Sequence, residues 1–198
     1  MVLLDTRFGL VPPLGEVLSP YRGLWWRPTP LFETHTKKHD LKIDGLKAKV
    51  VIKVDHDQIT HIFAENDHDL YFAQGYLLAS QRLWQMEFLL RTGSGRLSEV
   101  FGEKTLEFDR FFRKMGIAQA ANQSAALMME DAVTGPPLTA YTNGVNAYIA
   151  TLTEKTLPFE YKLLGHKPEQ WKVENAAALL KFMAWNLSGF SRDIALTR

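Results

Sequence analysis

Side chains that could bind a metal ion occur together at two places in the sequence. His35 and His39 are four residues apart, so on a helix they could share one ion. The lysines between them would repel a cation and no carboxylate accompanies them, which favours a solvated loop. Residues 65–69 (ENDHD) are rich in oxygen ligands, so calcium binding is conceivable. Their spacing is not that of an EF-hand, and capping of a following helix explains them more simply.

A self-contained catalytic centre is not evident in the pattern. The sequence has no GxSxG, HExxH, Walker A or GxGxxG motif. The segment GSGRLSE at 93–99 lacks the Lys-Ser/Thr pair of a phosphate loop, and its glycines favour the end of a helix. A catalytic triad is only a weak possibility, because no Ser or Asp partner stands out beside the scattered histidines His56, His61, His68 and His166.

Composition excludes several classes of function. The 198 residues contain 23 Lys plus Arg and 22 Asp plus Glu, a balance without the basic footprint of a nucleic-acid-binding protein. The absence of Cys excludes disulfides, thiolate zinc sites and a Cys nucleophile. No apolar run is long enough to predict a membrane span. The N-terminus lacks the apolar core of a signal peptide, so the protein is either cytosolic or already without its signal.

The chain divides into an arm and a body. Residues 1–39 are rich in Pro, Gly and Trp, which predicts an extended arm that packs on another surface through Trp25 and Trp26. The body, residues 40–198, begins with a small antiparallel sheet. We expect a hairpin turn at Asp44 and Gly45, a strand over 47–54, and a second strand over 59–64.

Helices fill the rest of the body. A long helix starts at Asn66 or Asp67 and ends at Gly93 and Gly95, and its apolar residues at 3–4 spacing predict burial on most sides. Further helices are expected at 97–101, 105–130, 138–152 and 173–187, with a loop between the last two. Gly144 suggests close helix packing. The helical segment 105–130 should supply the core with Leu106, Phe108, Phe111, Phe112, Met115 and Ile117.

Five blocks, in order, resemble the penicillin acylase (penicillin amidase) family of N-terminal-nucleophile hydrolases. They are PPLGEVLSPYRGLWW (12–26), VIKVDHDQITHIFAEND (51–67), the long helix with GSGRLSEVFGE (93–103), AYTNGVNAYI (140–149) and FEYKLLGHKPEQW (159–171). Together they cover most of the chain. The resemblance implies the small α subunit of a heterodimer cut from one precursor.

The resemblance also implies a fold and a reaction. The α/β fold would be a helix-rich chain completing a four-layer αββα architecture with a larger β chain. The family's nucleophile is an N-terminal Ser on that β chain, with its own α-amino group as base, so no catalytic residue is expected in this chain. The activity implied is amide hydrolysis of N-acylated small molecules such as β-lactam antibiotics, in the periplasm or outside the cell.

The segment MAWNLSGFSRDI (183–194) resembles the family's substrate and metal segment. Met183, Asn186 and Leu187 match positions that line the acyl pocket, although Asn186 stands where the family has Arg and Leu187 where it has Phe. Asp193 matches the Glu that binds a structural calcium ion shared with the β chain. Without the resemblance, Met183 and Leu187 would be read as core residues and Asp193 as a surface acid.

Other functions stay open. The same family includes acyl-homoserine lactone and cephalosporin acylases, and the scaffold could also serve as a non-catalytic binding module. A free-standing helical protein would fold alone, whereas we expect this chain to aggregate alone because its apolar helices would lack cover. The sequence does not decide whether Arg198 is the natural end.

Overall fold

The structure, a computed structural model, describes residues 42–57 and 59–188, and the chain divides into two compact units. The first unit contains Met1–Glu87 and Leu127–Val173, and the second contains Phe88–Ala126 and Glu174–Arg198. The long helix α2 (Asp67–Ser94) and helix α5 (Ile117–Glu130) each have residues in both units. The expected arm, residues 1–39, lies outside the described residues, and the expected boundary at residue 40 stays a prediction.

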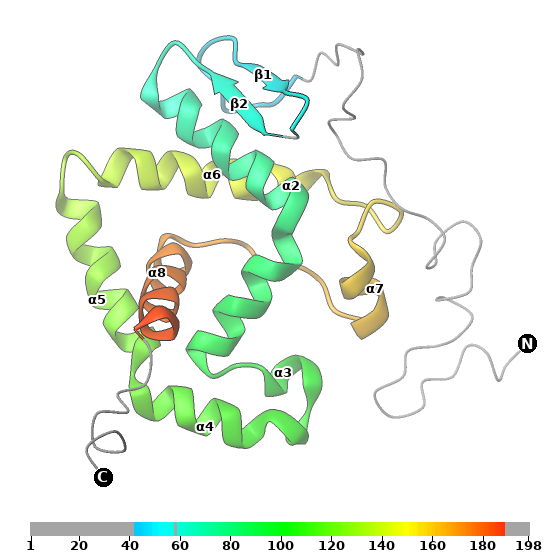
Figure 1. Cartoon of the computed structure of the whole chain (residues 1–198), viewed down its shortest axis with the longest axis vertical. Helices are drawn as coiled ribbons and strands as arrows, with labels where there is room; N and C mark the ends of the chain where they lie inside the picture. Colours follow the sequence, from blue (N-terminus) through cyan, green and yellow to red (C-terminus); the bar gives the residue numbers. More distant parts are fainter. Residues whose placement is uncertain (1–41, 58, 189–198) are drawn as a thin grey trace, which may run out of the picture. The chain divides into compact units, whose positions relative to one another are not determined.

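The first unit begins with the expected two-stranded antiparallel sheet (Figure 1). Strands β1 (Val51–Val54) and β2 (Thr60–Phe63) pair with Val51 opposite Phe63. A turn does form at residues 44–45, but the described residues on either side of it, 42–43 and 46–50, form no strand, so the expected hairpin there was wrong. The physical reason lies in the next residues, because the backbone N–H groups of Lys47 and Ala48 donate to the Asp69 carboxylate instead of a neighbouring strand.

Helix α2 packs against α6 (Gly135–Thr151) at two glycines, one on each helix. A Cβ atom at Gly75 would collide with the carbonyl oxygen of Tyr141, and a Cβ atom at Gly144 would collide with that of Phe72. The close approach predicted for Gly144 is therefore confirmed. The apolar stripe predicted for α2 is also confirmed, since each of its members is buried: Phe72, Tyr76, Ala79, Leu83, Met86 and Leu90.

Two features of the first unit were not predicted. Helix α2 is kinked at Arg82, whose φ of −141° lies outside the helical region. Helix α7 (Phe159–Leu164) occupies part of the segment expected to be a loop. It ends at Gly165 in the left-handed conformation, and its Tyr161 is fully buried. One buried aromatic side chain is a weaker signal than a long periodic pattern, which is why this helix escaped prediction.

The second unit contains four further elements besides the last turns of α2 and most of α5. They are α3 (Ser98–Phe101), the 3-10 turn η2 (Glu103–Thr105), α4 (Leu106–Met115) and α8 (Val173–Leu187), which matches the predicted last helix. Its core is formed by Phe112, Ile117 and Phe182, with Leu89 and Trp185 packed against them. Gly116, in the left-handed conformation, separates α4 from α5 and breaks the predicted helix 105–130 in two.

The core prediction for α4 was largely wrong. Phe112 and Ile117 are buried, but the other four residues expected in the core are exposed: Leu106, Phe108, Phe111 and Met115. Helix α4 has one face packed against the core of its unit, and no other described part of that unit buries these four side chains. Periodicity identified an apolar helix correctly, but it does not say how much of the helix surface the same chain covers.

Candidate functional site

Helix α8 presents its predicted pocket residues on an exposed face. With about 100° between successive residues, Leu180, Met183 and Leu187 fall within about 60° of one another. We call these three residues the outer stripe of α8; their exposed fractions are 58%, 50% and 77%. Asn186 is exposed beside the outer stripe. The structure thus brings Met183 and Leu187 onto one apolar face, with the Asn186 amide at its margin.

The opposite face of α8 is the packed one. Ala177, Ala178 and Phe182 are buried there, and the Trp185 ring lies 6.1 Å from that of Phe182. Met183 and Leu187 are therefore not core residues of this chain. Whether they line an acyl pocket stays a prediction, because a pocket needs a second wall.

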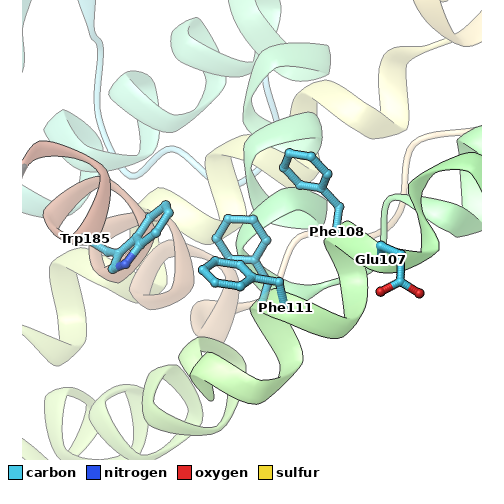
Figure 2. Close-up of a pocket in the computed structure, with 5 residues that line it drawn as sticks. Glu107, Phe108, Phe111 and Trp185 are labelled. Atoms are coloured by element: carbon cyan, nitrogen blue, oxygen red, sulfur yellow. The ribbon is translucent and has the colours of Figure 1, made fainter. Parts of the chain in front are cut away.

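A hollow of about 350 Å³ lies beside α4 and α8, within the second unit (Figure 2). It is apolar, with a Trp185 ring 6.1 Å from that of Phe111 and 5.2 Å from that of Phe112. Glu107 stands at its rim, with its carboxylate 2.6 Å from the guanidinium of Arg110. We call it the aromatic hollow; its lining is Glu107, Phe108, Phe111, Phe112 and Trp185. None of the predicted pocket residues lines it, and the closely spaced Phe108, Phe111 and Phe112 were its only sequence signal.

The glycine-rich segment 93–99 serves to join helices. The Asp109 carboxylate accepts hydrogen bonds from the N–H groups of Leu97 and Ser98, at 2.8 Å each, and from the Ser98 hydroxyl. Burial raises the pKa of Asp109, but these hydrogen bonds and the nearby Arg113 guanidinium outweigh it and hold the pKa below its usual range. An internal carboxylate therefore uses the N–H groups that a phosphate would need, which supports the helix-end interpretation of this segment.

A buried ion pair adds to the same junction. The Arg91 side chain is 1% exposed, and its guanidinium lies 2.7 Å from the carboxylate of Glu99. Arg96 contacts the same carboxylate at 2.7 Å and hydrogen-bonds it through Nε at 2.9 Å. The pKa of Glu99 is lowered first by the hydrogen bond from Arg96. These contacts tie the last turn of α2 to α3.

The acidic run at residues 65–69 caps α2, as predicted. The Asn66 side chain accepts a hydrogen bond from the Asp69 N–H at 2.9 Å. The fully buried Asp69 carboxylate accepts from the N–H groups of Lys47 and Ala48 and contacts His68 and the Asn66 amide. Burial raises its pKa, but these donors together hold the pKa well below its usual range. Because several donors already occupy the Asp69 oxygens, the structure favours helix capping over calcium binding at this segment.

Histidines of the first unit pair with carboxylates. His61 Nε2 lies 2.9 Å from an Asp55 oxygen, and this contact is the largest cause of the lowered pKa of Asp55. In the interior, the Tyr161 hydroxyl donates to Glu87 at 2.6 Å, and His166 Nε2 lies 3.0 Å from the other Glu87 oxygen. The second set joins α2 to α7 and the turn after it, a structural role that sequence reasoning missed.

The metal-site predictions are not tested by the described residues. Asp193, His35 and His39 lie outside them. Among residues 42–57 and 59–188, no group of three or more His, Asp or Glu side chains is placed to hold a metal ion. No helix in the described part of the chain combines the length and apolarity needed to cross a bilayer.

Comparison with known proteins extends the sequence resemblance. Residues 49–198 match the family model described as penicillin amidase. The chain is 36% identical over 141 residues to penicillin acylase 2 proenzyme of a Pseudomonas species, covering 71% of this chain and 18% of that protein. It is also 36% identical over 151 residues to the acyl-homoserine lactone acylase QuiP of Pseudomonas aeruginosa, covering 74% of this chain and 17% of that protein. This chain thus spans about a fifth of the length of these relatives.

A solved structure shows the same fold. The thermostable penicillin G acylase of Alcaligenes faecalis superposes with a TM-score of 0.64 at 23% identity, over 74% of this chain and 78% of that one. The described elements of this chain are rich in helix and poor in strand. The family-model match and the two relatives lead to the same assignment, and the chain belongs to the penicillin amidase family.

Proposed function

We propose that this chain is the smaller, α part of an amide hydrolase that removes an acyl group from N-acylated small molecules. The observation that carries the proposal is the family match over residues 49–198. One feature of the structure supports the subunit role: α4 and α8 expose large apolar side chains. Most of the enzyme, including its nucleophile, then belongs to a larger β chain from the same precursor.

The reaction would follow the N-terminal-nucleophile scheme. The Ser hydroxyl at the start of the β chain attacks the amide carbon, and its proton passes to the Ser α-amino group. That group has an unperturbed pKa of about 7.7–8.0, so it is partly neutral near neutral pH and can accept the proton. The amine leaves with a proton, and water then hydrolyses the acyl ester. Cleavage of the precursor would create this N-terminus, and this chain and the β chain together would form a four-layer αββα fold.

This chain would contribute one wall of the acyl pocket. Met183 and Leu187 would supply apolar surface, and Asn186 would supply a neutral amide that offers no charge to a carboxylate on the substrate. Asp193 would provide one oxygen ligand to a structural calcium ion completed by the β chain. The expected location is the periplasm or outside the cell.

The test is expression of the full-length gene product, followed by N-terminal sequencing of its fragments and a hydrolysis screen. The screen compares phenylacetyl, phenoxyacetyl, glutaryl and long-chain acyl amides. We expect a large fragment that begins with Ser and hydrolysis of at least one amide. An uncleaved product without hydrolysis would support a non-catalytic binding module instead.

A second substrate class has an observation in its favour. The 36% identity to a protein named as an acyl-homoserine lactone acylase equals the identity to the penicillin acylase 2 proenzyme. The same preparation should therefore be assayed with N-acyl homoserine lactones beside penicillin G. A rate on the lactone at least tenfold above that on the penicillin would place the enzyme in the second class.

A further inference from the structure

We draw no further inference here: the strongest candidate, the aromatic hollow beside α4 and α8 in the second unit, is an open apolar surface, and nothing in the structure shows what covers it.

Discussion

The helix pair α2 and α6 differs from the helix pair α4 and α8 in how completely the chain covers its apolar surface. In the first pair, backbone approaches backbone at Gly75 and Gly144, and the apolar stripe of α2 is buried. In the second pair, Phe112 is 4% exposed, whereas Phe108, one turn earlier, is 59% exposed. Described residues of this chain cover the apolar surface of the first pair, but they cover only one side of the second.

The buried contact between α2 and α6 stabilises the fold, whereas the exposed apolar faces of α4 and α8 are available to another molecule. A closed helix pair can hold the fold but leaves no surface for another molecule. An open apolar surface adds nothing to the stability of the chain alone and normally marks a site of interaction. The outer stripe of α8 and the aromatic hollow are open apolar surfaces of this kind.

The sharpest way to break the closed pair is Gly144→Ala. Alanine favours a helix over glycine by about 1 kcal/mol, so propensity alone predicts stabilisation. The added methyl group would instead collide with the backbone of α2 at Phe72, which cannot move without separating the helices. We expect a net loss of about 3 kcal/mol or more, measured as the yield of soluble processed protein and as the urea midpoint of what is recovered.

The control is Asn143→Ala, at the exposed neighbour of Gly144 in α6. It changes helix propensity in the same direction but adds no atom near α2, so its urea midpoint should equal or slightly exceed that of the unmodified enzyme. If Gly144→Ala behaved like this control, α2 and α6 would not be in backbone contact.

Next to the exposed face of α4, the Asp109 carboxylate holds the start of α3 through hydrogen bonds, which Asp109→Ala should remove. The substitution leaves the buried N–H groups of Leu97 and Ser98 without their acceptor. An expected loss of about 3 kcal/mol follows from the cost of buried unsatisfied donors. Glu107→Gln, at an exposed carboxylate of the same helix paired with Arg110, should change stability by less than about 0.5 kcal/mol. Equal urea midpoints for both variants would contradict the role given to Asp109.

The same contrast explains which parts of the fold could be predicted from sequence. The apolar periodicity predicted the bounds of α8 and the buried stripe of α2, because apolar residues that recur at 3–4 spacing over many turns indicate both a helix and its buried face. Gly144 was a correct signal of close packing, since glycine destabilises a helix interior relative to alanine and close packing of backbones compensates for that cost. These features are fixed by interactions within the chain.

The wrong predictions have two causes: apolar residues that turned out to be exposed, and a side chain that competes with a strand for backbone N–H groups. Phe108 and Phe111 have the periodicity of core residues, but the pattern does not say whether the cover belongs to this chain. The strands expected beside Asp44 and Gly45 were displaced because Asp69, some twenty residues later, takes the N–H groups of Lys47 and Ala48. The predicted pocket residues lie together on α8, but their partner wall is not in the described chain.

Acid should weaken the closed unit through Asp69. Its folded-state pKa lies below the value of about 3.9 expected in the unfolded chain, so the unfolded state binds the proton more readily. The stabilisation is complete above about pH 5 and is lost as the pH falls through and below about 4. Asp69→Asn should remove this pH dependence and cost about 1–3 kcal/mol at neutral pH, from weakened buried hydrogen bonds. Urea midpoints of both proteins between pH 3 and 7 measure it, and parallel curves would contradict it.

The smallest effect on stability is expected where the surface is most open. Phe108→Ser and Phe111→Ser remove aromatic side chains that are about half exposed or more, so each should change the free energy of unfolding of this chain's own fold little, by about 0.5 kcal/mol. Both should nevertheless raise the solubility of the chain expressed alone and weaken its association with the β chain, because they remove apolar area that the described residues leave exposed. Light scattering of the isolated chain and co-purification of the two chains measure these effects. If both variants left solubility and association unchanged, this face would be ordinary exposed surface, and the contrast between the two helix pairs would say nothing about where the β chain binds.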